Sequence, residues 1–120
     1  MYNLLKKSKR IKKVRKNILR LGLPRLSIFR SNRHIYLQLI SVIDGGRVLI
    51  SSSSVEQSVK QEFLVHKWNK KDIAVFVGKL FVKRFKEHNF GRFVFDRSGF
   101  KFHGRVKEAV MVLREGGLCF

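Results

Sequence analysis

Apolar positions in the first half of the chain fall into three short runs separated by turn residues. The runs Leu26–Phe29, Ile35–Ile40 and Val48–Ser51 each have the length and composition of a β-strand. A Ser31-Asn32 turn separates the first two runs, and Asp44-Gly45-Gly46 is a strong hairpin signal before the third. The pattern predicts three sequential strands in an antiparallel meander.

The apolar spacing changes to that of a helix after residue 72. Asp72 favours a helix start through its charge, and Asn89 and Gly91 tolerate the left-handed conformation that ends a helix. The apolar face of this predicted helix consists of Ile73, Phe76, Val77, Leu80, Phe81 and Phe85. The polar residues 52–71 are predicted to form a loop, with one turn of helix near Val55–Phe63 as the alternative.

A short strand and a last helix complete the predicted domain. Phe93–Phe95 is apolar throughout, which is typical of a parallel strand covered on both faces. Helical spacing resumes after Gly104, and the apolar face consists of Val106, Ala109, Val110 and Leu113. The resulting order βββαβα predicts an α+β fold of two layers, in which helices pack on a mixed sheet.

The N-terminal segment has a helical pattern of its own, in which cations surround apolar residues. Gly22 and Pro24 would end that helix. We therefore predict a basic helical arm at residues 1–22 and a globular domain at residues 23–120. One domain of this length, with 44% hydrophobic residues, can bury a modest core.

The charge distribution indicates a polyanionic partner. The chain has 27 Lys and Arg against 8 Asp and Glu, a formal net charge of +19. Residues 1–43 hold no acid at all, so the arm is expected to order on nucleic acid. The predicted RNA contacts of the arm are Lys6, Lys7, Lys9, Arg10, Lys12, Lys13, Arg15, Lys16 and Arg20.

Several other classes of protein fit the sequence poorly. No apolar run approaches the ~20 residues that span a bilayer, so no membrane partner is expected. The single cysteine, Cys119, cannot form an internal disulfide, and the four histidines share no ligand pattern, so no metal or cofactor is expected. A two-metal nuclease needs converging carboxylates, whereas the first strand has none. We expect no enzyme and no small-molecule substrate, and Asp96 is expected to cap a turn or pair with Arg97.

Candidate binding residues gather in two segments, the first hairpin and the loop before the last helix. Cations there can hold phosphate, and aromatic rings can stack on bases. The hairpin candidates are Arg25, Ser27, Phe29, Arg30, Ser31, Asn32, Arg33, His34 and Tyr36. The loop candidates are Arg97, Ser98, Phe100, Lys101, Phe102, His103, Gly104 and Arg105. Burial of Phe29 in the sheet is the open alternative, and His103 could instead cap the last helix.

Three sequence blocks resemble one known family. Phe95-Asp96-Arg97-Ser98-Gly99-Phe100-Lys101-Phe102-His103-Gly104-Arg105-Val106-Lys107 resembles the signature FDRGG-[YF]-x-[YF]-HGRVKA of the bacterial-type 5S rRNA-binding protein, the eighteenth family of the large ribosomal subunit. Pro24–Tyr36 is similar to its RPRLSVFRSNKHIYAQ block, and Arg114–Phe120 to its REAGLxF ending. The likeness runs from about Lys9 to Phe120. Ser98 replaces a glycine of the signature, and Phe100 and Phe102 stand where tyrosines are common.

The resemblance implies a structural protein of the large ribosomal subunit without catalytic activity. Such a protein would bind 5S rRNA and help attach it to the large-subunit rRNA at the central protuberance. Its partners would be these RNAs and neighbouring large-subunit proteins, in the ribosome of a bacterial cytoplasm or an organelle (mitochondrial) matrix. The alternative is a general basic nucleic-acid-binding protein outside the ribosome.

Overall fold

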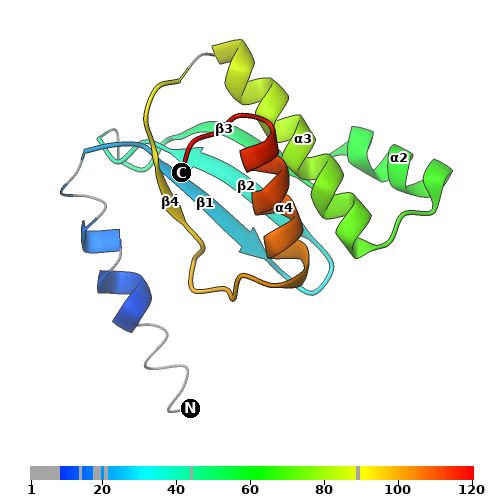
Figure 1. The fold of residues 1–120 in the computed structure, drawn as a ribbon, viewed down its shortest axis with the longest axis horizontal. Helices are drawn as coiled ribbons and strands as arrows, with labels where there is room; N and C mark the ends of the chain where they lie inside the picture. The colour runs from blue at the N-terminus through cyan, green and yellow to red at the C-terminus, as the bar shows by residue number, and fades with distance from the viewer. Residues whose placement is uncertain (1–8, 14, 18–19, 21, 44, 89) are drawn as a thin grey trace.

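Four strands form one mixed sheet in the computed structural model, which describes residues 9–13, 15–17, 20, 22–43, 45–88 and 90–120 (Figure 1). The strands are β1 (Arg25–Arg30), β2 (Ile35–Ile40), β3 (Val48–Ser53) and β4 (Val94–Asp96). Their order across the sheet is β3-β2-β1-β4. The first three strands are antiparallel neighbours, and β4 runs parallel to β1. The predicted meander and mixed sheet are confirmed.

Three helices follow the meander: α2 (Gln57–His66), α3 (Lys70–His88) and α4 (Gly104–Glu115). Helices α3 and α4 lie on one face of the sheet, and α2 lies beside α3 (Figure 1). Alternate strand residues point into this layer because side chains alternate along a strand. The fully buried core includes Leu26, Ile28, Leu37, Leu39, Val77, Phe81, Val106, Val110 and Leu113. The predicted apolar faces of α3 and α4 therefore supply the helical half of the core.

Helix α3 begins at Lys70, two residues before Asp72, whose charge predicted the start of the helix. The Asn69 N–H donates to Asp72 Oδ2 at 3.2 Å, and the Asp72 N–H donates to Asn69 Oδ1 at 2.9 Å. This reciprocal pair satisfies two backbone donors that have no partner inside the helix. Asp72 thus lies in the first turn of the helix, and Asn69 precedes its first residue.

The prediction of a loop over residues 52–71 was wrong, because Gln57–His66 forms the ten-residue helix α2. The alternative, a helical turn near Val55–Phe63, was closer, since α2 overlaps that range and extends beyond it. Only Val59 of this helix is buried, so its sequence lacks the repeated apolar positions that mark α3. Contacts outside the helix hold it in place instead. Trp68, just after it, stacks on His66 with ring centroids 5.2 Å apart and lies 5.0 Å from the Phe76 ring of α3.

The start of α2 is fastened to α3 by Glu56. Its carboxylate accepts the Ser53 N–H at 2.9 Å and pairs with Arg84, whose Nη2 lies 2.7 Å from Oε1. Burial opposes ionisation of Glu56, but the bonds from Arg84 and Ser53 outweigh it, and the pKa of Glu56 is lowered from 4.5. A carboxyl whose pKa is lower in the folded state stabilises the fold only while it is ionised.

We expect Glu56→Gln to lower the free energy of unfolding at neutral pH, by about 1 kcal/mol or less because the pair is partly solvated. The difference from the unmodified chain should disappear as the pH falls from 4.5 through the lowered pKa of the folded state. Urea unfolding at several pH values measures this difference. Glu87→Gln on the exposed side of α3 is the control, and a pH-independent difference for Glu56→Gln would contradict the assigned cause.

The sequence predicted a parallel strand covered on both faces, but β4 lies at an edge of the sheet. Val94 and Phe95 are half-buried, so neither face of the strand is fully covered. Phe95 packs against Phe120 at the chain end, with ring centroids 4.9 Å apart. The apolar run at β4 therefore reflects packing against the C-terminal residues more than burial between two layers.

The arm lies beside the β4 edge of the sheet (Figure 1), and its residues 9–13 and 15–17 are helical. Gly22, with φ of +68°, follows them in the left-handed conformation that L side chains rarely adopt. Lys6 and Lys7 lie outside the described residues, so their predicted roles stay predictions. The division into an arm at 1–22 and a domain at 23–120 likewise stays a prediction.

Candidate nucleic-acid interface

Three aromatic rings gather on the face of the sheet opposite to α3 and α4. The register places Phe29 of β1 opposite Tyr36 of β2, and their ring centroids are 6.0 Å apart. Phe100, from the loop after β4, meets Phe29 edge-on at 5.6 Å. Phe29 is 51% exposed, so the alternative that it is buried in the sheet is wrong. We call Phe29, Tyr36 and Phe100 the aromatic cluster.

Arg30 lies at the aromatic cluster, and Arg105 lies at the neighbouring β1–β2 turn. Arg30 Cζ lies 5.4 Å from the centroid of the Phe100 ring, a cation–π distance. Burial and then the charge of Arg30 lower the pKa of Arg105, whose Nη2 donates to the carbonyl of Ser31, the residue after Arg30. Among the described residues, no ion pair joins Arg30, Arg33 or Arg105 to a carboxylate. Two neighbouring cations without an acid attract an anion such as phosphate.

The β1–β2 turn is held in place by the last two helices. Lys70 Nζ of α3 donates to the Asn32 carbonyl at 2.9 Å, and Arg105 Nη2 of α4 donates to the Ser31 carbonyl at 3.0 Å. The side chains of Ser31 and Asn32 remain exposed, as does that of Arg33. The turn therefore presents three polar side chains to solvent from a fixed backbone.

His34 is held where the turn enters β2. Its Nδ1 lies 3.0 Å from Ser54 Oγ, which also accepts the Ile35 N–H at 3.0 Å. The His34 ring is 6.4 Å from the Tyr36 ring. One hydroxyl thus fixes a candidate ligand side chain next to the aromatic cluster.

Asp96 ends β4 and joins three parts of the chain. Its side chain is 4% exposed. Oδ2 accepts from Arg25 Nη1 of β1 at 2.8 Å and from Arg15 Nε of the arm at 3.3 Å, while Oδ1 accepts the Ser98 N–H at 2.9 Å. The expectation that Asp96 caps a turn is confirmed, whereas its arginine partners are Arg25 and Arg15 and not the expected Arg97. Its carboxylate therefore orients the loop that follows.

The turn after Asp96 uses two left-handed residues, Ser98 with φ of +56° and Gly99 with φ of +78°. Glycine adopts this conformation without strain, whereas serine does not, which gives a physical reason for the glycine of the family signature at position 98. Ser98 and Ser27 are buried, and their Oγ atoms lie 3.1 Å apart. These two predicted RNA contacts therefore point into the protein and hold the loop against β1.

The rest of the loop presents its side chains outward. Arg97, Lys101, Phe102 and His103 are exposed, and Arg114 Cζ of α4 lies 5.8 Å from the centroid of the Phe102 ring. His103 occupies the position before α4 but makes no side-chain capping bond, so its ring does not serve as a cap. Gly104 begins α4 with φ of +58°. The loop thus ends in an exposed strip of two cations, a histidine and an aromatic ring.

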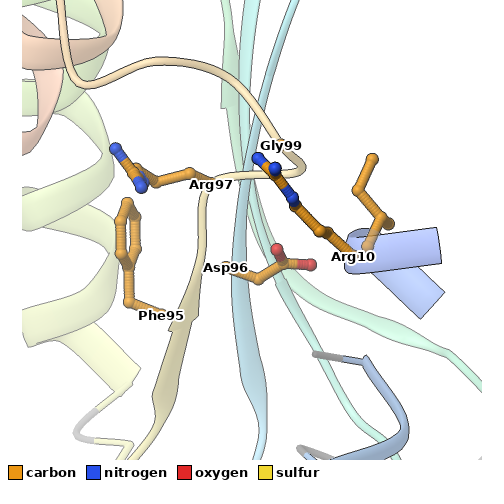
Figure 2. A pocket seen from close by; sticks show the side chains of 6 residues that line it. Arg10, Phe95, Asp96, Arg97 and Gly99 are labelled. Carbon is orange, nitrogen blue, oxygen red and sulfur yellow. The ribbon is translucent and has the colours of Figure 1, made fainter. Parts of the chain in front are cut away.

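A pocket of about 320 Å³ lies between the arm and this loop (Figure 2). Arg10 and Ile11 line it from the arm, and Phe95, Asp96, Arg97 and Gly99 line it from the β4 side. In Figure 2 the Arg10 side chain extends toward the turn at Gly99, whereas Arg97 points toward Phe95. The pocket brings one predicted arm contact, Arg10, together with one predicted loop contact, Arg97.

No sequence pattern indicated that Lys70 would anchor the β1–β2 turn or that Arg15 would contact Asp96 before the loop. Lys70 is 38 residues from Asn32, and Arg15 is 81 residues from Asp96. Within the described ranges, no three His, Cys, Asp or Glu side chains gather as a metal site would require. The same residues include no helix with the length and hydrophobicity of a membrane span.

Comparison with known proteins identifies the family. A family model described as ribosomal L18 of archaea, bacteria, mitochondria and chloroplasts matches residues 2–120. The chain is 50% identical over 97 residues to large ribosomal subunit protein uL18 of Desulfosudis oleivorans, which covers 81% of this chain and 77% of the relative. It is 40% identical over 121 residues to the protein of the same name from Leptothrix cholodnii, with 98% and 99% covered. The chain therefore belongs to the ribosomal L18 family and is a structural protein of the large ribosomal subunit.

Proposed function

We propose that this chain binds 5S rRNA and helps attach it to the large-subunit rRNA at the central protuberance. The observation that carries the proposal is the aromatic cluster together with Arg30 and Arg105, two close cations without a carboxylate partner in the described part of the chain. Stacking surfaces beside unpaired cations suit RNA loops, whose unpaired bases and phosphates are both accessible.

The aromatic cluster would receive unstacked bases. Phe29 offers half of its surface to solvent, and Phe100 and Tyr36 brace it from two sides. A ring that is already fixed loses little conformational freedom on binding, so more of the stacking free energy contributes to affinity. Arg30 and Arg105 would hold the phosphates on either side of such a base, in the two-pronged geometry that guanidinium allows.

The arm would supply affinity with little sequence preference. Its described cations are all exposed: Lys9, Arg10, Lys12, Lys13, Arg15, Lys16 and Arg20. Each cation that meets a phosphate releases condensed counterions, which gives a salt-dependent and sequence-independent contribution. Because Arg15 pairs with Asp96, the arm and the loop 97–103 would approach the RNA in a fixed relation.

The chain would act as an adaptor and not as an enzyme. Both Asp96 oxygens accept hydrogen bonds from the protein, so this carboxylate is a poor candidate for holding a catalytic metal. The partners would be 5S rRNA, large-subunit rRNA and neighbouring large-subunit proteins. The alternative, a general basic nucleic-acid-binding protein, would use the charge without needing the aromatic cluster.

Phe29→Leu tests the observation that carries the proposal. Leucine fills much of the same space against Tyr36 and Phe100 but cannot stack on a base. We expect affinity for 5S rRNA to fall by about 1–3 kcal/mol, the usual contribution of one stacked base, and affinity for an unrelated duplex to stay the same. Filter-binding titrations on both RNAs measure these changes.

Phe63→Leu on α2 is the matched control, since Phe63 is also a partly exposed phenylalanine. It should leave both affinities unchanged. Thermal unfolding of each variant shows whether Phe29→Leu has disturbed the fold. Equal affinity of Phe29→Leu and the unmodified chain for 5S rRNA would remove the aromatic cluster from the interface and favour the general basic protein.

A further inference from the structure

Helix α2 leaves large apolar side chains in solvent. Leu64 is 72% exposed and Phe63 is 40% exposed, although both belong to a helix that buries only Val59. These three residues and Ile73 of α3 line a groove of about 330 Å³, which Arg33 and Lys60 also line. We call this the α2 groove. Exposed apolar surface of this kind, bordered by charged residues, marks interaction sites on folded proteins.

The charge around the α2 groove is positive. Among the described residues that line it, Arg33 and Lys60 are cationic and none is acidic. Of the acids next to the lining residues along the chain, Glu62 lies 3.1 Å from His66, and Asp72 accepts the Asn69 N–H at 3.2 Å. In the described ranges no ion pair involves Arg33 or Lys60. An occupant that completes the groove would therefore carry an apolar side chain and a carboxylate close to each other.

Three kinds of molecule could occupy the α2 groove: a second copy of this chain, RNA, or a segment of another protein. A second copy of a chain with a net charge of +19 would be repelled. RNA could stack a base on Phe63, but the other apolar lining residues are aliphatic and offer no stacking face. Ribose and phosphate placed against Leu64 and Ile73 would lose water without gaining hydrogen-bond partners. An acidic protein segment satisfies both the aliphatic lining and the cations.

We propose that the α2 groove docks an acidic segment of a neighbouring protein in the large ribosomal subunit. An apolar side chain of that segment packs against Phe63 and Leu64, and its carboxylate pairs with Lys60 or Arg33. A groove of this size lies near the lower end of the ~300–1,000 Å³ of known ligand sites, so it takes one or two side chains of a short segment. The inference rests on family membership and is independent of the proposed contacts with 5S rRNA.

The test is a photochemical cross-link inside assembled subunits. The photoreactive residue is introduced as Leu64→p-benzoylphenylalanine, and purified large subunits that contain the labelled chain are irradiated. We expect a cross-link to a peptide of another large-subunit protein with Asp or Glu within a few residues of the linked site. The control is Val65→p-benzoylphenylalanine, since Val65 is 74% exposed but does not line the groove. Its yield per incorporated copy should be at least tenfold lower.

The charge part of the proposal is tested with Lys60→Glu in the Leu64-labelled chain. We expect the cross-link yield to fall at least fivefold, because the carboxylate of the docked segment then meets a like charge. A cross-link to rRNA, a cross-link to a second copy of this chain, or a yield no higher than that of Val65 would each overturn the proposal. Binding to 5S rRNA, measured separately on the Phe29→Leu variant, can fail or succeed without changing this result.

Discussion

A chain that lacks residues 1–16 is expected to bind 5S rRNA on the order of 10²–10³-fold more weakly at physiological salt. Eight cations and no acid lie in that segment. Each phosphate contact contributes about 0.7 to 0.9 to the logarithmic salt slope, so the slope should become shallower by several units. Titrations at 50, 100 and 200 mM salt measure both quantities together.

The truncation should change stability far less than affinity. It removes Arg15, but Asp96 keeps its shorter bond to Arg25 and its bond to the Ser98 N–H. Arg15 is 45% exposed, and an ion pair so accessible to water contributes little to folding. The control replaces the exposed Lys79, Lys83 and Lys86 of α3 by Gln, which removes charge from another surface. An unchanged salt slope in the truncated chain would show that the arm is not an electrostatic anchor.

Asp96→Ala is expected to lower the free energy of unfolding by about 3–5 kcal/mol, because it leaves Arg25 in a largely buried position without a counterion. The Arg25 side chain is 18% exposed and has its shortest ion-pair contact with this carboxylate, at 2.8 Å. The Ser98 N–H would also lose its acceptor. Urea unfolding measures the change, and Glu115→Ala at the exposed end of α4 is the control.

Asp96→Asn tests the effect of this carboxylate on RNA binding separately from its effect on folding. Its amide oxygen can still accept from Ser98 but cannot neutralise Arg25, so the loop should shift while the domain stays folded. We expect 5S rRNA affinity to fall by about 1–3 kcal/mol, the scale of a hydrogen bond to a charged group. In the same samples, labelled 5S rRNA should stay intact with and without magnesium. Cleavage by the unmodified chain that disappears in the variant would contradict the adaptor function.

Local sequence patterns were sufficient for most of the fold. The four residues predicted for the buried face of α4 are all fully buried, because a helical repeat of apolar residues can be satisfied only against a core. Strand β2 has the predicted bounds, since alternation and turn residues both mark it. Helix α2 was not predicted because it lies mostly in solvent and therefore has no apolar repeat in its sequence.

The geometry of the site depends on contacts that no local pattern contains. Any of 27 cations could have paired with Asp96, yet the fold brings Arg25 and Arg15 to it. The serine motifs looked like surface contacts, but Ser27 and Ser98 face each other in a buried position because β1 and β4 are parallel neighbours. Phe29 is exposed because none of the described helices covers its face of the sheet.

The pairing of β1 with β4 also determines when the protein can fold during its synthesis. Seventy-one residues separate Arg25 from Asp96, so β1 leaves the ribosome long before its second neighbour has been made. Until then the β1 edge has unpaired N–H and C=O groups, while the arm is already complete and positively charged. A nascent or prematurely ended chain can therefore attract RNA through its charge before the aromatic cluster, which needs Phe100 from the loop after β4, has formed. Such unfinished chains combine an open strand edge with a strong attraction for polyanions, which makes them aggregation-prone products that the cell must remove.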